Sequence, residues 1–554
     1  MLKRSSIAYF SMEVGLRNDI PTYAGGLGIL AGDMIRSSAD LRVPLVAVTL
    51  VSKQGHFRQE ITTDGKQIEY PSEWDPSKLM TLLPEEVEVQ IHGNLVTVKA
   101  WLYECTSKSY MGGVVPLLFL DTDVNENAPE DREITHFLYG GDERYRLKQE
   151  VVLGIGGVKI LDALGFEIRR FHMNEGHSSL LTIELLQKYG LSTEKVREAC
   201  IFTTHTPVEA AHDKFTFDLV QEVMGEPIPL DLLKRYGGED RLNMTRLALN
   251  LSKRINGVSE SHRNVTMEMF PGYEVRAITN GVHSFYWTCK PFRKLYDTYL
   301  TGWANEPELL MRADIIPNEK VWQAHVEAKK ELIDYVNATT NIGMINEALT
   351  LGFARRSTAY KRSKLLFSDT ERLKTISKRG WIQVIFAGKA HPKDMMGKRL
   401  IEELYDYIEE LEGWIKIVYL ENYDMEMAAK LISGVDVWLN TPLPPLEASG
   451  TSGMKAAHNG VLNFSVLDGW WAEGWIEDVT GWAIGPNQDD LLSPEERGVR
   501  EKYDIYGKLE FVILPKFYRE RREWVEMMKS SIGKIASYFN SHRMMRRYAT
   551  EAYV

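Results

Sequence analysis

Cysteine is scarce in this chain, with only Cys105, Cys200 and Cys289 among 554 residues. The three are far apart and odd in number, so neither a disulfide framework nor a cysteine metal site is predicted. A sparse set of thiols is typical of proteins that fold in a reducing compartment. We therefore expect a cytoplasmic protein.

The sequence also lacks an excess of basic residues and long hydrophobic runs. Its 66 Lys and Arg are outnumbered by 77 Asp and Glu, which gives a net charge of −11. That charge argues against general affinity for nucleic acids or for anionic membrane surfaces. No apolar stretch approaches the about 20 residues that span a bilayer, and no signal-peptide core precedes the first apolar segment at 7–12.

What is present is enough apolar sequence for more than one core. With 554 residues, 44% of them hydrophobic, and 13 tryptophans, the chain should divide into two domains. Apolar strand candidates alternate with helical patterns, which indicates an α/β fold with parallel sheets and covering helices. We expect domains at 1–290 and 291–515, and a helical tail at 516–554 that packs back on the N-terminal domain.

The expected elements follow from hydrophobic periodicity. The predicted strands are 7–12, 43–51, 114–122, 167–173, 199–205, 382–387, 415–420, 435–440 and 461–467. The predicted helices include 27–40, 146–163, 177–189, 320–338, 396–411 and 425–433.

The segment Glu447–Lys455, EASGTSGMK, lies between two of these predicted strands. In α/β folds the loops at this place bind ligands, and the free N–H groups of a glycine-rich loop suit an anion or sugar hydroxyls. Lys455 follows at once. Taken alone, such a loop fits either a ligand site or an ordinary strand-to-helix turn.

Two further segments favour anion binding. Tyr23–Leu30, YAGGLGIL, places paired glycines at the entry of a helix, where the backbone can approach a ligand or form a tight turn. Arg355–Arg362, RRSTAYKR, holds four cations in eight residues. These cations are either a solvated surface or a clamp for a dianion, because arginine offers a bidentate fork and lysine a point charge.

Three shorter motifs would each be assigned to core packing if they stood alone. They are Thr203–Pro207 with His205 and the nearby His172–His177, Ile255–Val258 with Asn256, and Leu420–Tyr423.

Together these segments, in order from about residue 7 to residue 475, resemble the α-glucan (glycogen, starch or maltodextrin) phosphorylases in a short form. The resemblance implies two Rossmann-like domains facing a central cleft, the GT-B glycosyltransferase architecture. It also implies retaining phosphorolysis of an α-1,4-glucan to α-D-glucose 1-phosphate. Pyridoxal 5′-phosphate would be the cofactor, and its phosphate would be the acid–base partner of the substrate phosphate. A homodimer or larger homo-oligomer is expected, with no metal, nucleic-acid or membrane partner.

The resemblance also implies roles for individual residues. Lys455 would anchor the cofactor, which would be bound further by Thr451, Ser452, Arg355, Tyr423 and Gly26. Arg356 and Lys361 would hold the substrate phosphate and, with Lys455 and His205, form the catalytic set. His205 and Asn256 would bind the glucose 6-hydroxyl, and the other substrate-binding residues would be Glu447, Ser449, Gly450, Gly25 and Leu27.

The chain departs from the family pattern at several positions. Ser452 and Gly453 replace the common Gly-Asn pair, Glu175 replaces an aspartate, and Trp470-Trp471 follow Asp468-Gly469. The changes at 452–453 and 470–471 are expected to affect the acceptor side without removing the lysine or Glu447, whereas the change at 175 puts a specific role for Glu175 in doubt. The short chain has little room for an N-terminal regulatory extension, so control by phosphorylation or nucleotides is expected to be absent.

Two alternative functions are consistent with the same architecture. A nucleotide-sugar glucosyltransferase, such as a glycogen synthase, would show no pyridoxal absorbance and would not need Lys455. A non-catalytic glucan-binding protein would retain only the cleft, and the joint presence of Arg356, Lys361 and Lys455 argues against it.

Overall fold

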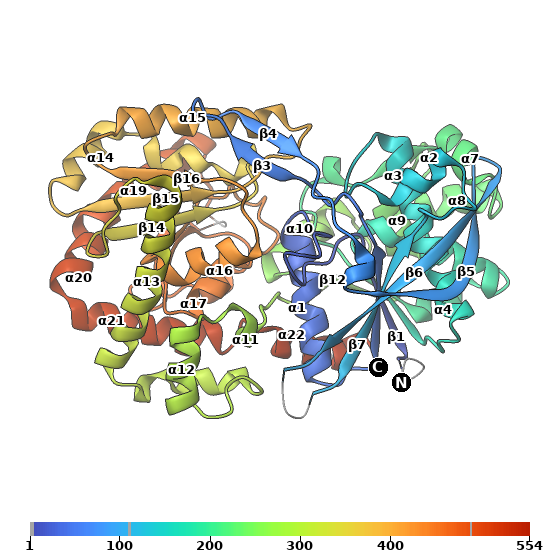
Figure 1. Ribbon diagram of the computed structural model, residues 1–554, viewed down its shortest axis with the longest axis horizontal. Helices are drawn as coiled ribbons and strands as arrows, with labels where there is room; N and C mark the ends of the chain where they lie inside the picture. Colours follow the sequence, from blue (N-terminus) through green and yellow to red (C-terminus); the bar gives the residue numbers. More distant parts are fainter. Residues whose placement is uncertain (1–4, 109–111, 488–489) are drawn as a thin grey trace. The chain divides into compact units, whose positions relative to one another are not determined.

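The computed structural model describes residues 5–108, 112–487 and 490–554, and the chain forms two compact units (Figure 1). The first unit contains residues 1–57, 71–279 and 544–554, and the second contains residues 58–70 and 280–543. The division differs from the expected one in three places. It falls at 279/280 rather than at 290, the hairpin 58–70 belongs to the second unit, and only 544–554 of the tail belongs to the first.

The physical reason for these differences is where the apolar side chains are buried. Residues 505–536 pack into the core of the second unit, together with Ile61 of the hairpin. Met544, Met545 and Tyr548 pack instead into a core of the first unit that contains Leu30 and Ile35.

The first unit is built on a nine-stranded sheet in the order β13-β12-β9-β8-β1-β2-β7-β6-β5. All neighbours are parallel except β6 and β5, which extend one edge as antiparallel strands. The strands are β1 (Ile7–Ser11), β2 (Leu45–Leu50), β5 (Thr81–Ile91), β6 (Asn94–Thr106), β7 (Val114–Asp121), β8 (Arg170–Asn174), β9 (Cys200–Thr203), β12 (Arg254–Gly257) and β13 (Arg276–Ala277).

The helices of this unit alternate with its strands. They are α1 (Gly26–Asp40), α2 (Pro129–Arg132), α3 (Glu143–Val151), α4 (Gly157–Ala163), α5 (Leu181–Lys188), α6 (Thr193–Ala199), α7 (Phe217–Met224), α8 (Leu230–Gly237), α9 (Met244–Asn250) and α10 (Glu260–Met269). A small antiparallel pair, β10 (Lys214–Thr216) and β11 (Arg241–Asn243), lies outside the large sheet.

The second unit contains a six-stranded, fully parallel sheet in the order β16-β15-β14-β17-β18-β19. Its strands are β14 (Leu349–Ala354), β15 (Ile382–Ala387), β16 (Lys416–Leu420), β17 (Val437–Asn440), β18 (Leu462–Val466) and β19 (Gly481–Ile484). Its helices are α11 (Ser284–Trp287), α12 (Lys290–Tyr299), α13 (Asn318–Thr340), α14 (Thr370–Ser377), α15 (Met395–Glu410), α16 (Met425–Gly434), α17 (Ser452–Ala457), α18 (Trp471–Gly474), α19 (Pro494–Lys508), α20 (Leu514–Arg519) and α21 (Arg521–Ser531). Helix α22 (Ser541–Glu551) crosses the boundary between the units.

Both sheets reverse their strand order at one point. In the second unit the chain runs from β14 outward to β16 and then returns to the other side of β14 with β17. The parallel strands of the first unit do the same on either side of β1, with β2 and β7 on one side and β8 and β9 on the other. Ligands of doubly wound α/β folds bind at the carboxyl ends of the strands beside such a reversal. A ligand-binding site is therefore expected in the loops after β1, β8, β14 and β17.

The predicted α/β class is confirmed, and each of the nine predicted strands overlaps a strand of the structure. The sequence did not predict β14, which reads Leu-Thr-Leu-Gly-Phe-Ala and is buried at every residue. Its internal glycine weakens the strand signal. Gly352 is required because a Cβ atom there would lie 2.9 Å from Val435 and 3.1 Å from Trp438. Among the described residues, no helix is long and apolar enough to cross a membrane.

Candidate active site

Three charged side chains of the second unit meet at the reversal of its sheet. Arg355 follows β14, Lys361 lies six residues further on, and Glu447 is in the loop after the neighbouring strand β17. Arg355 Nη2 and Lys361 Nζ both donate to Glu447 Oε2 at 2.5 Å. The exposed fractions of these side chains are 7%, 11% and 11%. The predicted residues Arg355, Lys361 and Glu447 are thus brought together from segments about 90 residues apart in the chain.

The low exposure and the close contacts shift the pKa values of Glu447 and Lys361. Burial by itself raises the pKa of the Glu447 carboxyl, but Arg355 and Lys361 outweigh it and lower that pKa to about 2. Burial and the neighbouring Arg355 lower the pKa of Lys361 to about 8, although Glu447 opposes the change. At neutral pH the group therefore carries two positive charges and one negative charge, and its surplus is positive.

Asp468, which the sequence reading did not select, holds the Glu447 loop. Its Oδ2 accepts a hydrogen bond from the Glu447 backbone N–H at 2.9 Å, and its Oδ1 accepts one from the Gly469 N–H at 2.8 Å. Burial raises the pKa of Asp468 to about 7, and the nearby charge of Glu447 adds to the effect. The only sequence signal for this role is its position two residues after β18.

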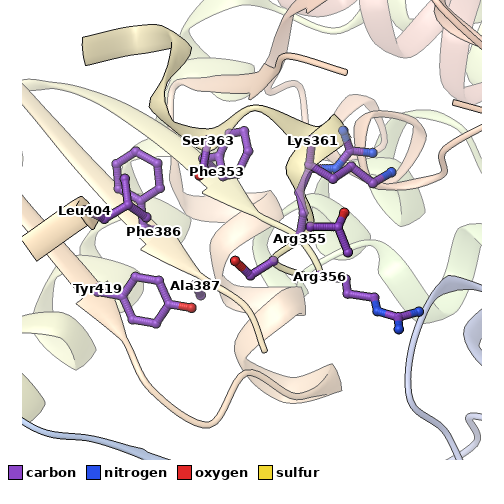
Figure 2. A pocket seen from close by; sticks show the side chains of 11 residues that line it. Phe353, Arg355, Arg356, Lys361, Ser363, Phe386, Ala387, Leu404 and Tyr419 are labelled. Atoms are coloured by element: carbon purple, nitrogen blue, oxygen red, sulfur yellow. The ribbon is translucent and has the colours of Figure 1, made fainter. Parts of the chain in front are cut away.

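A small cavity lies beside the basic segment (Figure 2). Figure 2 shows Arg355, Arg356 and Lys361 on one side of it and the apolar Phe353, Phe386 and Leu404 on the other. The complete lining is Phe353, Arg355, Arg356, Ser357, Thr358, Lys361, Ser363, Phe386, Ala387, Leu404 and Tyr419.

Two guanidinium groups at this cavity have N–H groups that can bind an anion. Arg355 Nη1 is buried and has no hydrogen-bond partner among the described residues. Arg356 is exposed, and within the described ranges it forms no ion pair or hydrogen bond. An unpaired buried guanidinium nitrogen is costly unless a ligand satisfies it, so this arrangement fits a phosphate group.

Lys455 is buried on the short helix α17, with its Nζ 3.9 Å from the ring centroid of Trp287. Its backbone N–H donates to the carbonyl of Thr451, the N-cap of α17. Asn459 Nδ2 donates to the carbonyls of both Lys455 and Trp287, which fixes the lysine backbone beside the ring. Trp287 and Asn459 were not selected from the sequence.

Ser452 and Gly453, the two residues of the 449–453 loop that depart from the family pattern, each lie beside a buried tryptophan. Ser452 Oγ accepts a hydrogen bond from the Trp438 indole at 2.9 Å. A Cβ atom at Gly453 would lie 2.7 Å from the Trp470 ring and 2.3 Å from Asn463 Oδ1. An asparagine at position 453 is therefore incompatible with this packing, and the glycine and the tryptophan belong together.

The remaining predicted residues of this unit lie in the loops after β16 and β17. Ser449 is buried and its carbonyl accepts a hydrogen bond from the Trp470 N–H, while Gly450 has a positive φ of 77°. Tyr423 follows Asn422, which has a left-handed φ of 56°, and burial raises the pKa of the Tyr423 hydroxyl.

In the first unit the glycine pair is held by a buried carboxylate. Glu13 follows β1, and its Oε2 accepts hydrogen bonds from the N–H groups of Ala24 at 2.6 Å and Gly25 at 3.1 Å. A Cβ atom at Gly25 or Gly26 would meet nothing within 4 Å, whereas one at Gly28 would lie 2.7 Å from Glu13. Packing therefore requires Gly28 but not Gly25 or Gly26. The partly exposed Gly25 and Leu27 and the exposed Gly26 leave the start of α1 open to a ligand.

The His205 ring is oriented by Asn174, the last residue of β8. Asn174 Nδ2 donates to Ser11 Oγ, which leaves Asn174 Oδ1 as the acceptor for His205 Nε2 at 2.7 Å. Burial and the neighbouring histidines lower the pKa of His205 to about 3, so the ring is neutral at physiological pH. With the proton on Nε2, Nδ1 is a hydrogen-bond acceptor.

Glu175, whose role was in doubt, holds the backbone of this histidine. Its carboxylate accepts hydrogen bonds from His205 N–H at 2.7 Å, Thr206 Oγ1 at 2.9 Å and Gly176 N–H at 3.0 Å. Its φ of 76° is unusual for a residue with a side chain. Strain of this kind persists where surrounding contacts enforce it, and it has no signature in the sequence.

The side-chain amides of Asn256 and Asn280 differ in their hydrogen bonding. Asn256 Oδ1 accepts from Thr203 Oγ1 at 2.9 Å, and its Nδ2 donates to Tyr548 Oη and to the Gly257 carbonyl, both at 3.1 Å. Asn280 Oδ1 is buried and has no hydrogen-bond partner among the described residues. The sequence reading selected Asn256 and passed over Asn280.

The strand order and the cationic group at the sheet reversal define an α/β protein with a site for anionic ligands. Comparison with known proteins gives the family. Residues 230–474 match the family model described as carbohydrate phosphorylase. The chain is 40% identical to a maltodextrin phosphorylase of Thermococcus litoralis, over 99% of this chain and 70% of that protein. It is 37% identical to a glycogen phosphorylase of Aquifex aeolicus, over 99% of this chain and 86% of that protein.

An uncharacterized protein of Methanocaldococcus jannaschii is 33% identical over 99% of both chains. The chain therefore belongs to the carbohydrate phosphorylase family, as its motifs predicted.

The ion pairs at Glu447 lead to a prediction about stability. Glu447→Ala would leave Arg355 and Lys361 as neighbouring buried cations, which should cost about 3 kcal/mol of stability and lower the Tm. Inorganic phosphate should raise the Tm of this variant more than that of the wild type, because the freed cations bind the anion. Differential scanning fluorimetry with increasing phosphate measures both effects.

Glu403→Ala is the matched control, since Glu403 pairs with Lys364 in a more exposed position. Because the folded pKa of Glu447 lies below the ordinary value of 4.5, its stabilisation is complete above about pH 4.5 and is lost as the pH falls toward 2. The Tm difference between wild type and Glu447→Ala should follow that course. An equal response to phosphate in all three proteins would contradict the interpretation.

Proposed function

We propose that this protein is an α-glucan phosphorylase, which cleaves the terminal α-1,4 bond of a maltodextrin or glycogen chain with inorganic phosphate. The observation that carries the proposal is the cationic group of Arg355 and Lys361 around Glu447, beside the exposed Arg356, at the reversal of the second sheet. Relatives named maltodextrin phosphorylase and glycogen phosphorylase support it.

The residues present fit pyridoxal 5′-phosphate as the cofactor. Lys455 supplies a buried amine against the face of Trp287, and Arg355 Nη1 is a buried donor available to a phosphate oxygen. Thr451, Ser452, Tyr423 and Gly26 are the further residues proposed to hold the cofactor. When bound, its phosphate would supply an acid–base group next to the substrate phosphate.

The substrate phosphate is proposed to bind Arg356 and Lys361. As a dianion it would compete with Glu447 for Lys361, so Glu447 could turn to a sugar hydroxyl, with Ser449 and Gly450 beside it. The phosphate protonates the glycosidic oxygen as the bond from C1 to that oxygen breaks, and a phosphate oxygen then bonds to C1 on the same face. The positive group stabilises the charge that builds up on the phosphate.

The first unit is proposed to bind the glucan. The Nδ1 atom of neutral His205 accepts a hydrogen bond from a sugar hydroxyl and does not act as an acid, since its pKa is far below physiological pH. Gly25, Gly26 and Leu27 offer an open helix start, which favours negative charge. In this proposal the two units are the two Rossmann-like domains of the GT-B architecture, and the protein assembles as a homo-oligomer.

The function is tested by incubating the purified protein with maltoheptaose and phosphate and measuring glucose 1-phosphate. We expect activity together with pyridoxal absorbance, and we expect Lys455→Ala to lose both because the amine is gone. Lys430→Ala, which changes an exposed lysine on α16, should retain both. Full activity of Lys455→Ala, or use of a sugar nucleotide in place of glucose 1-phosphate for synthesis, would overturn the proposal.

Arg356→Ala should weaken the use of phosphate much more than the use of glucan. Loss of a bidentate partner of a dianion should cost about 2–5 kcal/mol of transition-state stabilisation. Steady-state kinetics with each substrate varied in turn measures the split. Arg399→Ala removes a guanidinium that is 73% exposed and serves as the control. An unchanged phosphate dependence would mean that Arg356 is only a surface residue.

Asn280, rather than Asn256, is our candidate for the amide that binds a sugar hydroxyl, because its buried oxygen is unsatisfied. Asn280→Ala should raise the KM for glucan about five- to tenfold, the value of one hydrogen bond, with little change in Tm. Asn256→Ala breaks three hydrogen bonds inside the first unit and should mainly lower the Tm. The opposite pattern would restore Asn256 as the sugar ligand.

A further inference from the structure

A hairpin from the N-terminal part of the sequence is built into the second unit. The chain leaves the first unit after Phe57, forms β3 (Arg58–Ile61) and β4 (Gln67–Tyr70), and returns to the first unit at Pro71. Its two strands pair in antiparallel fashion. Figure 1 shows this blue hairpin beside α15 of the second unit, and Gly65 at its turn lies against Glu402 and Tyr405 of that helix. We call residues 58–70 the strap.

Gln59 uses every polar atom of its side chain on the strap and the second unit. Its side chain is 1% exposed. Nε2 donates to the Gly388 carbonyl at 2.9 Å and to Gln67 Oε1 at 2.8 Å, while Oε1 accepts from the Asn422 N–H at 2.9 Å. The Gln59 N–H in turn donates to Asn422 Oδ1 at 3.2 Å. One residue of the strap therefore binds two separate loops.

Gln67 extends the same contact along the first of these loops. Its Nε2 donates to the Ala390 carbonyl and its Oε1 accepts from the Ala390 N–H, both at 2.9 Å. Both glutamines are buried, and a buried amide is tolerated only when its hydrogen bonds are made. The hydrogen bonds to these loops therefore depend on the glutamine side chains at positions 59 and 67.

Of the two loops that the strap holds, one packs against the segment that carries Arg355 and the other carries Tyr423, a proposed cofactor residue. The 388–390 loop follows β15, and its Lys389 carbonyl accepts from the Ser357 N–H at 3.0 Å. A Cβ atom on Gly388 would lie 1.9 Å from the Arg355 carbonyl, so this loop lies directly against the backbone of Arg355. Asn422, held by Gln59 in its left-handed conformation, immediately precedes Tyr423.

We propose that Gln59 is a positioning residue for the phosphate and cofactor site, and that the strap is a part of that site supplied by the N-terminal half of the sequence. The inference rests on the proposed function, since that function gives Arg355 and Tyr423 their ligands. Binding groups must be held within about 0.5 Å of their working positions, and backbone hydrogen bonds from a buried amide do this. A strap that only tethered the chain would not need to bind these two loops.

The test compares Gln59→Met, which keeps the side-chain volume without its hydrogen bonds, with Glu60→Gln on the same strap. Glu60 forms an ion pair with the exposed Arg58 and is itself 43% exposed. Two ligands are measured on protein freed of cofactor: pyridoxal 5′-phosphate by absorbance, and inorganic phosphate by the rise in Tm. We expect Gln59→Met to bind each about ten- to hundredfold more weakly, with unchanged far-ultraviolet circular dichroism, and Glu60→Gln to match the wild type.

Equal binding by the wild type and Gln59→Met would overturn the inference while leaving the proposed function intact. If the wild type itself bound neither ligand, the proposed function would fail and the inference with it. Should Gln59→Met not fold, Gln67→Met tests the same inference, because it removes the two hydrogen bonds to Ala390 and leaves the contact with Asn422 in place. We then expect at least fivefold weaker binding of inorganic phosphate, and no change would again overturn the inference.

Discussion

The shared ion pair of Arg355 and Lys361 with Glu447 is the interaction on which the second unit's site depends. Three charges with low exposure are stable only because each has a partner. Burial lowers the pKa of Lys361 and by itself raises that of Glu447, but Arg355 and Lys361 outweigh it and lower the pKa of Glu447. The group has a positive surplus, which favours an anionic ligand. It also ties the loop after β14 to the loop after β17, the two strands at which the sheet order reverses.

Buried carboxylates organise the loops of both units in the same way. Glu13 binds the N–H groups of the glycine segment, Glu175 binds the backbone of His205, and Asp468 binds the backbone of Glu447. Each lies just after a strand of a parallel sheet, and each satisfies backbone donors that would otherwise lack partners at the strand ends. None of them needs to touch a substrate to matter. They fix the loops in which the proposed ligand-binding residues lie, as the strap does from a distant part of the chain.

The departures from the family pattern have a similar physical explanation. Gly453 stands where a larger residue is common, and the space that its side chain would fill is occupied by Trp470 and Asn463. Ser452 is bonded to a buried tryptophan of β17. In this chain Trp438, Asn463 and Trp470 pack around the start of the Lys455 helix, and the lysine and Glu447 are retained.

The sequence by itself determined the α/β class, nine strands of the two large sheets, the family and the segments that carry the charged and glycine-rich motifs. It could do so because hydrophobic period and short motifs are local properties of the chain. Only the tertiary structure decided that Glu447 is the counter-ion of Arg355 and Lys361, and that the strap belongs to the second unit. It also decided that the amide of Asn256 is fully engaged, whereas Oδ1 of Asn280 has no hydrogen-bond partner among the described residues. It also gave Glu13, Glu175 and Asp468 their roles. These facts depend on contacts between residues far apart in the chain and on burial, and neither leaves a periodic signal in the sequence.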